Sequence, residues 1–239
     1  MIDNFEQRRI ERIVVLTGAG VSAESGLATF RDARGLWEKH NPMDIATPEA
    51  FARDPQLVYR FYNARRNQLR EAAPNSAHRA LARLQREFPG HVFLVTQNVD
   101  DLHERGGSEQ VCHMHGQLRS MRCQACNALM SAEADYDSGS SCTLCGVTGR
   151  LRPDIVWFGE FPYHMEEIEG QLAACDLFVA IGTSGVVYPA AGFVQQALSH
   201  GAMTIEVNKH TSEVSGLFHQ QRQGDATRQV SALVDELLA

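Results

Sequence analysis

The chain has 239 residues, a net charge of −7 and 44% hydrophobic residues. This size allows one large domain, or one domain with a small satellite, and the apolar content suffices for a sizeable core. An acidic chain without a long basic run is a poor partner for nucleic-acid phosphates, so we expect no direct nucleic-acid binding. No apolar run reaches the roughly 18–20 residues that cross a bilayer, and the first ten residues lack the pattern of a secretory signal. We therefore expect no membrane association and a cytoplasmic location.

Apolar runs and helical patterns alternate along the chain. Short apolar runs typical of buried parallel strands lie at Ile13–Leu16, Val92–Val95, Leu177–Ile181 and Met203–Val207. Helical patterns lie at Ser76–Phe88, Ala190–His200 and Ala226–Leu238. This alternation predicts an α/β fold built on a Rossmann-like, doubly wound parallel sheet.

A glycine-rich segment follows the first predicted strand. Gly18, Gly20 and Ala23 fit the G-x-G-x-x-G/A pattern, in which glycine lets backbone N–H groups approach a pyrophosphate without an intervening Cβ. An ordinary dinucleotide fold would then run a helix into a strand that ends in an acidic residue. This chain has instead the polar and aromatic run from Glu24 to Trp37, which indicates more than a phosphate cradle.

Two segments interrupt the alternation. Residues 37–74 have no strand pattern but contain helical stretches at Pro48–Arg53 and Leu57–Glu71, and residues 119–150 hold four cysteines. We expect both to be insertions that form a smaller lobe, helical and zinc-binding respectively. Residues 1–36, 75–118 and 151–239 would then form the nucleotide-binding domain. After Pro74, Asn75 or Ser76 is the expected N-cap of the next helix.

Polar residues follow the second predicted strand, where ligands bind in open α/β sheets. Gln97, Asn98 and Asp100 can hydrogen-bond ribose hydroxyls and a carboxamide, whereas Asp101 and His103 are expected only to stabilise the turn. Further on, His113 and His115 alternate with other residues, and we expect them to face opposite sides if this segment is extended. A histidine in such a segment is more often structural. His115, however, follows a nucleotide-like loop and precedes the segment with four cysteines, which favours a functional role.

The four cysteines of the second insertion form two C-x-x-C pairs. Cys123 and Cys126 are separated by fifteen residues from Cys142 and Cys145, within the spacing of zinc sites. Four thiolates close a tetrahedron and leave no open position, so the spacing predicts one structural Zn²⁺ and not a catalytic one. A redox dithiol pair is the alternative. Because the segment is too polar to bury its own core, metal binding would supply its folding free energy.

Six motifs in this order resemble the sirtuins, NAD-dependent protein lysine deacylases, in their compact bacterial form. They are G-A-G-V-S-A-E-S-G with F-R-D, T-Q-N-V-D-D-L-H, the H-G at His115, the paired C-x-x-C, R-P-D-I-V-W-F-G-E and G-T-S, and they extend from about residue 12 to residue 226. The resemblance implies NAD as a consumed co-substrate and acylated-lysine proteins as partners, with a monomer as the expected state.

The resemblance also assigns NAD contacts to the matching positions. The phosphates, the two riboses, the nicotinamide and the adenine would lie against Gly18, Ala19, Gly20, Ser22, Ala23, Glu24, Ala28, Phe30, Arg31, Trp37, Gln97, Asn98, Val99, Asp100, Gly182, Thr183, Ser184, Asn208, Lys209, His210 and Ala226. At Lys209 and His210 the chain departs from the family, in which an acidic residue commonly follows the asparagine.

The implied reaction transfers the acyl group to ADP-ribose. The acyl oxygen attacks C1′ of the nicotinamide ribose, and nicotinamide leaves. His115 then takes a proton from the ribose diol, which suits an imidazole that titrates near neutral pH. The products are lysine, nicotinamide and O-acyl-ADP-ribose. Phe30 would shield C1′ from water.

Two loops are expected to hold the substrate peptide as an added strand. They are Val156–Glu160 and Gly185–Tyr188, with Val156, Phe158, Gly159 and Val187 as contacts. Core packing is the alternative role for Trp157, Phe158 and Tyr188.

Tyr62 and Arg65 lie three apart on a predicted helix and so share a face. The pair resembles that of sirtuins that remove succinyl and malonyl groups, since an arginine binds a carboxylate bidentately and a tyrosine adds one bond. Ala46 would leave room for such an acyl group. We expect deacetylation as well. An exposed pair on an arginine-rich helix is the alternative.

Three other functions use parts of the same pattern. An NAD-dependent dehydrogenase would not need the insertion with four cysteines. A non-catalytic module that binds acyl-lysine or ADP-ribose would not need His115. Mono-ADP-ribosyl transfer shares the first half of the chemistry and is distinguished by labelled protein in place of O-acyl-ADP-ribose.

Overall fold

The computed structural model describes residues 9–27 and 41–239. Its larger sheet is parallel, with the strand order β3-β2-β1-β7-β8-β9. The strands are β1 (Arg12–Thr17), β2 (His91–Thr96), β3 (Cys112–His113), β7 (Leu177–Ile181), β8 (Met203–Asn208) and β9 (Gln220–Gln223). The chain proceeds outward from β1 to one edge and then outward from β7 to the other. The strand order therefore reverses between β1 and β7, and in such sheets ligands bind at the carboxyl ends beside this point.

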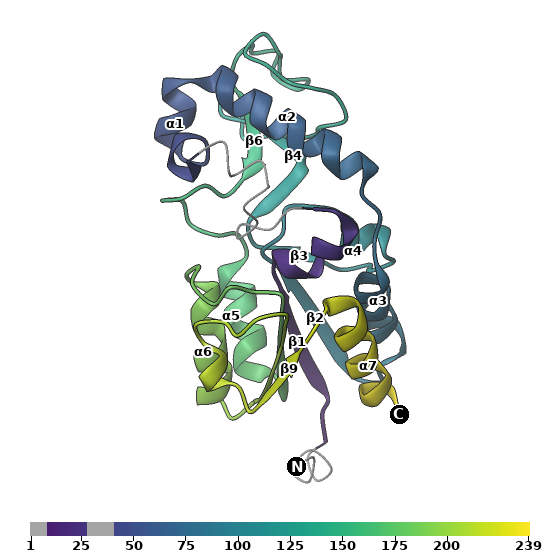
Figure 1. Cartoon of the computed structure of the whole chain (residues 1–239). Helices are drawn as coiled ribbons and strands as arrows, with labels where there is room; N and C mark the ends of the chain where they lie inside the picture. The colour runs from purple at the N-terminus through teal and green to yellow at the C-terminus, as the bar shows by residue number, and fades with distance from the viewer. Residues whose placement is uncertain (1–8, 28–40) are drawn as a thin grey trace.

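Helices cover both faces of this sheet (Figure 1). Alternate residues of β1 enter different cores: Ile13 and Val15 pack with α3 (Ser76–Glu87) and α7 (Ala226–Leu238), whereas Val14 and Leu16 pack with α5 (Met165–Ala174) and α6 (Phe193–Ser199). Successive side chains of a strand point to opposite faces, so a continuous apolar run is what a strand buried on both sides requires.

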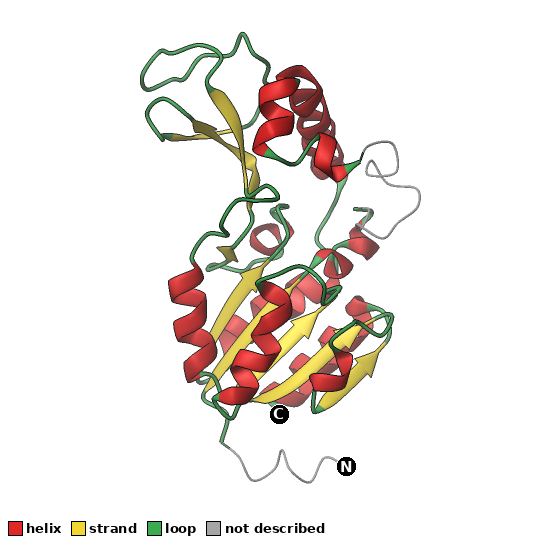
Figure 2. Ribbon diagram, turned by 90° about the vertical axis from the view of Figure 1, so that its left-hand side faces the viewer, coloured by secondary structure: helices red, strands yellow, loops and turns green. Residues whose placement is uncertain are grey.

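A smaller lobe stands at the carboxyl end of the parallel strands (Figure 2). It contains α1 (Pro48–Arg53), α2 (Pro55–Glu71) and an antiparallel sheet of order β5-β4-β6. Its strands are β4 (Gly116–Cys123), β5 (Leu129–Ser131) and β6 (Leu151–Ile155). One apolar core joins α2 to this sheet and includes Tyr62, Trp157 and Cys123.

Short helical segments connect the larger elements. They are η1 (Ala19–Val21), η2 (Ala23–Ser25), η4 (Pro42–Asp44), α4 (Leu102–Arg105), η5 (Ala190–Gly192) and η6 (Ser215–Leu217). Asn75 is the N-cap of α3, as predicted, and accepts hydrogen bonds from the amides of Ala77 and His78. Among the described residues, no helix is both long and apolar enough to span a bilayer.

The four predicted strands and the predicted helices are confirmed, with one difference: the segment expected as a helix over Ala190–His200 begins as the 3₁₀ turn η5. The predicted α/β class with a smaller helical and cysteine-bearing lobe is also correct. The elements without a sequence prediction are β3, β9, α4, α5 and the three strands of the smaller sheet.

Candidate active site

The glycine-rich segment lies at the switch point of the parallel sheet. The Gly18 amide donates to the Ile181 carbonyl at 2.9 Å, and the Gly20 amide donates to the Gly182 carbonyl at 3.0 Å. A Cβ on Gly20 would lie 2.6 Å from the Gly182 Cα, and Gly182 itself has a φ of 63°. Glycine is thus required here because the loops after β1 and β7 touch one another. The sequence prediction explained these glycines by a pyrophosphate contact alone.

Ser22 belongs to a buried hydrogen-bond network under this segment. His78 lies 3.3 Å from the Ser22 hydroxyl, and that hydroxyl donates to Asp100 at 3.1 Å. The Asn98 amide group donates to Ser22 and to the Gly18 carbonyl, both at 3.2 Å. Burial lowers the pKa of His78 to about 4, so this imidazole is neutral. The network fixes the glycine-rich segment against α3 and the loop after β2.

His103 has a larger structural role than the turn stabilisation expected for it. It is fully buried, and its Nε2 lies 2.9 Å from the Thr17 hydroxyl, which itself donates to Thr96. Burial holds the pKa of His103 well below its ordinary value. Asp101 sits at the N-cap position of α4 without a side-chain capping bond and pairs instead with Arg119 at 2.9 Å. The sequence feature that could have indicated the contact of His103 is the pair of threonines, Thr17 and Thr96, at the ends of two adjacent strands.

His113, which ends β3, and His115, which follows it, both lie against the loop after β2. Nδ1 of His113 is 3.3 Å from the Asn98 carbonyl, and Nδ1 of His115 is 3.1 Å from the Gln97 carbonyl. The expectation that they face opposite sides is wrong, because residues two apart in an extended segment lie on the same face. His113 is buried and contacts Glu104 at 2.6 Å, whereas His115 is partly exposed.

The residues expected around adenosine lie at the ends of β7 and β8 and at the start of α7. Asn208 donates to the Thr183 carbonyl at 2.6 Å, and Lys209 pairs with Asp225 at 3.0 Å. Ala226 opens α7 beside Asp225, and His210 is exposed. Thr183 is buried, and Ser184 follows it in the loop after β7.

The carboxylate of Glu24 contacts the N-terminus of α7. Its carboxylate accepts from the amide of Thr227 at 3.0 Å and from the hydroxyl of Thr227 at 2.7 Å. A carboxylate at a helix N-terminus is stabilised by the helix dipole, which gives Glu24 a structural function. The predicted contacts at Ala28, Phe30, Arg31 and Trp37 lie outside the described residues.

The predicted acyl-binding residues lie in the smaller lobe. Tyr62 is 1% exposed, and its hydroxyl accepts a hydrogen bond from Nε1 of Trp157 at 2.9 Å. Burial raises the pKa of Tyr62 to about 12, although the nearby charge of Arg65 lowers it. Ala46 is buried, and its carbonyl accepts from the Phe158 amide at 2.9 Å. Val99, expected near the cofactor, packs against the same core.

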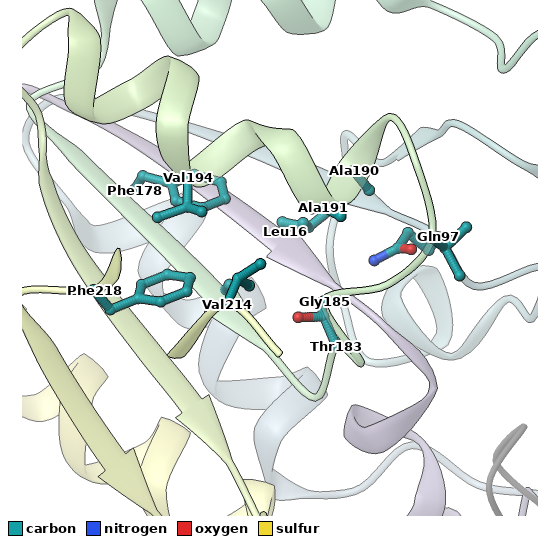
Figure 3. Close-up of a pocket in the computed structure, with 12 residues that line it drawn as sticks. Leu16, Gln97, Phe178, Thr183, Gly185, Ala190, Ala191, Val194, Val214 and Phe218 are labelled. Atoms are coloured by element: carbon teal, nitrogen blue, oxygen red, sulfur yellow. The ribbon is translucent and has the colours of Figure 1, made fainter. Parts of the chain in front are cut away.

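Both predicted peptide-binding loops have exposed apolar side chains. Phe158, Val187 and Tyr188 are exposed by 46%, 40% and 76%, whereas Trp157 is 2% exposed and belongs to the core. Gly159 has a φ of 88° in a tight turn, where glycine is favoured. A pocket under the second loop is lined by Gln97, Gly185, Val187 and, deeper, by Phe178 and Phe218 (Figure 3).

The four cysteines of the smaller lobe come together as predicted. Their Sγ atoms all lie within 4.8 Å of one another, and two of the pairs are 3.7 Å apart. A zinc ion with Zn–S bonds of about 2.3 Å requires S–S separations of about 3.8 Å, so the donor set fits Zn²⁺. In each C-x-x-C turn the residue after the second cysteine, Asn127 or Gly146, has a positive φ and donates its amide to the first cysteine's carbonyl.

Comparison with known proteins agrees with this geometry. The model of the Sir2 family matches residues 18–189. A protein of Vibrio parahaemolyticus named NAD-dependent protein deacylase is 54% identical over 99% of this chain and 98% of its own length. A protein of the same name from Shewanella oneidensis is 52% identical over 96% of this chain and 95% of its own length.

Solved structures give the same result. A Sir2 homologue in complex with NAD superposes with a TM-score of 0.88 at 39% identity, over 96% of this chain and 90% of that chain. A Sir2 protein bound to an acetylated peptide superposes with a TM-score of 0.84 at 26% identity, over 99% and 98%. The family match and the identity over nearly the whole length lead to one conclusion: the chain belongs to the Sir2 family.

Proposed function

We propose that this protein is an NAD-dependent protein-lysine deacylase that removes acetyl groups and also succinyl and malonyl groups. The observation that carries the proposal is the convergence of three consecutive residues on the predicted site. The Val156 amide donates to the His115 carbonyl, the Trp157 side chain to Tyr62 and the Phe158 amide to the Ala46 carbonyl, each at 2.9 Å. The predicted base and the predicted acyl-binding residues therefore adjoin one substrate loop.

NAD would bind in the crevice at the switch point. Gly18, Ala19, Gly20, Ser22 and Ala23 would face its phosphates, together with Gly182, Thr183 and Ser184. Gln97 would bind the nicotinamide ribose, Asn98 and Asp100 would shape the nicotinamide pocket, and Asn208 would face the adenosine. NAD supplies the electrophilic C1′ carbon that accepts the acyl oxygen when nicotinamide leaves.

His115 is the proposed general base. Because the Gln97 carbonyl can only accept, the 3.1 Å contact assigns the proton to Nδ1 and leaves a lone pair on Nε2. Burial lowers the pKa of His115, so the ring is neutral at physiological pH. It would take a proton from a ribose hydroxyl, whose oxygen then attacks the acyl carbon. Free lysine and O-acyl-ADP-ribose would result.

The acyl group would enter between Ala46 and the Tyr62–Arg65 face of α2. A protonated phenol and a guanidinium offer hydrogen bonds to a distal carboxylate, which succinyl and malonyl groups have and acetyl lacks. The guanidinium remains charged even though burial lowers its pKa, because arginine stays protonated in proteins. The peptide would lie between the Val156–Glu160 and Gly185–Tyr188 loops as an added strand.

The test compares two arginines of the same helix. Arg65→Met removes the proposed carboxylate ligand, whereas Arg60→Met removes an exposed arginine one turn away. Mass spectrometry of acetyl- and succinyl-lysine peptides with and without NAD would measure both activities. Arg65→Met should lower the kcat/KM of desuccinylation about 10- to 100-fold more than that of deacetylation, because a hydrogen bond to a charged group is lost. Arg60→Met should change neither activity.

Equal losses of both activities in Arg65→Met would refute the acyl-binding role. NAD-independent product, or ADP-ribose attached to the peptide in place of O-acyl-ADP-ribose, would refute the deacylase reaction itself.

A further inference from the structure

Trp157 is the buried residue of the Val156–Glu160 loop, and its indole contacts Tyr62 of the predicted acyl pocket. Its ring lies 3.6 Å from the guanidinium carbon of Arg152 and 5.3 Å from the ring of Phe51. Arg152 in turn pairs with Glu160, whose carboxylate also accepts from the Trp157 amide at 2.9 Å. A cation over the indole face, itself held by Glu160, and the ring of Phe51 beside it leave the indole little freedom to rotate.

This fixed ring points its only polar group at Tyr62. Indole Nε1 is a donor and nothing else, so the 2.9 Å contact makes the Tyr62 oxygen the acceptor. A phenol has one proton, and that proton must therefore point away from Trp157. The pKa of Tyr62 is raised to about 12 by burial, so the proton is present throughout the working pH range.

We infer that Trp157 is a positioning residue for acyl selectivity: it occupies the acceptor side of the Tyr62 hydroxyl and thereby directs the Tyr62 proton to the distal carboxylate of an acidic acyl group. This inference rests on the proposed function. Without the indole N–H, the hydroxyl could donate to other acceptors and would lose orientation before the substrate arrives. An acetyl group has no distal carboxylate, so its removal does not use this donor.

A double-mutant cycle tests the inference. Trp157→Phe keeps an aromatic ring but removes the N–H, and Tyr62→Phe removes the hydroxyl that the N–H contacts. The readout is the ratio of kcat/KM for a succinyl-lysine peptide to that for the matching acetyl-lysine peptide. Trp157→Phe should lower this ratio about three- to tenfold, the effect of one hydrogen bond. In the Tyr62→Phe background, Trp157→Phe should lower it no further.

Phe51→Leu is the matched control, because it trims a ring that packs against Trp157 without contacting the Tyr62 hydroxyl through a hydrogen bond. It should leave the ratio unchanged even if both activities fall. If Trp157→Phe does not fold, as judged by thermal melting, the sulfur isostere benzothienylalanine can be placed at position 157 by amber suppression. It retains the bicyclic ring and lacks the N–H.

The outcomes separate this inference from the proposed function. A ratio that falls in Arg65→Met and Tyr62→Phe but not in Trp157→Phe, or not in the isostere, overturns the inference and leaves the proposed function intact. A ratio that stays unchanged in Arg65→Met overturns the proposed acyl-binding role and the inference that rests on it, and leaves the deacylase reaction itself intact. An additive effect of Trp157→Phe on top of Tyr62→Phe assigns Trp157 a packing role only and also overturns the inference.

Discussion

At the scale of residues, His115 and His113 show how two neighbouring imidazoles acquire opposite properties. Burial lowers the pKa of His115, and the carbonyl of Gln97 compensates only in part. Burial also acts on His113, but Glu104, the Asn98 carbonyl and the charge of Asp100 together outweigh burial and raise the pKa. His115 is therefore the one suited to accept a proton at neutral pH, and His113 is suited to hold one.

The pH dependence of deacylation follows from this difference. A base is active when unprotonated, so a lowered pKa extends activity toward acid. We expect the acid limb of kcat/KM to have its midpoint below about 6.5, the ordinary value of histidine. Steady-state rates with an acetyl peptide between pH 5 and 9 measure it. Glu104→Gln should not move this midpoint, and His115→Tyr should abolish turnover while leaving the protein folded. A midpoint above 6.5, or residual turnover in His115→Tyr, contradicts the assignment.

Sequence reasoning can relate residues that lie close together along the chain. Tyr62 and Arg65 could be paired because positions three apart share a helix face, and the cysteines because two short turns have a recognisable spacing. The contact of Trp157 with Tyr62 spans 95 residues of chain. No periodicity encodes such a contact, so Trp157 could be assigned to the core or to the substrate loop but not to its partner.

At the scale of elements, the strands that are buried on both faces of the sheet are the ones that the sequence predicts. β1, β7 and β8 are predictable because they are nearly continuous apolar runs. β9 is the edge strand Gln-Gln-Arg-Gln, which has no apolar residue to mark it, and β3 has only two residues. α5 has a glycine at position 170 in its interior and no side-chain cap at its N-terminus, and both weaken its helical pattern.

The N-terminus of α3 connects helix stability to the nucleotide crevice. Asn75 accepts from the amides of Ala77 and His78, and its own amide group donates to the Val21 carbonyl at 2.9 Å and to Ser25 at 3.0 Å. Asn75→Ala should lower the free energy of unfolding by about 1–2 kcal/mol, the effect of a lost cap, and should raise the KM for NAD. Urea unfolding and steady-state kinetics measure the two effects.

Asn75→Asp separates them, because aspartate still caps the helix but cannot donate to the glycine-rich segment. It should restore stability and still raise the KM for NAD. If the KM for NAD is normal in both variants, the link between α3 and the crevice has no role in NAD binding.

At the scale of the whole molecule, the chain contains two kinds of core. The parallel sheet is covered by apolar helices on both faces, and its cores contain no cysteine of the metal cluster. The core of the smaller lobe runs without a break from Cys123 and Cys142 to Tyr62 and Trp157. The cysteine cluster and the proposed acyl pocket therefore share one core, and β4, which belongs to it, begins directly after the proposed base His115.

Removal of zinc should therefore unfold the smaller lobe and spare the larger one. Without the ion, four thiols packed within 4.8 Å would no longer hold the two C-x-x-C turns together, and the core around Tyr62 and Trp157 would open. Hydrogen exchange after chelation should show lost protection in β4 and β6 and retained protection in β1, β2 and β7. Deacylation should stop, and Cys142→Ala should behave like the chelated protein.

Cys175→Ala, which removes a buried cysteine beside the parallel sheet, is the matched control and should keep both zinc and activity. Uniform loss of protection across both lobes would mean that they share one cooperative core, and a fully active zinc-free protein would mean that the cluster has no structural role.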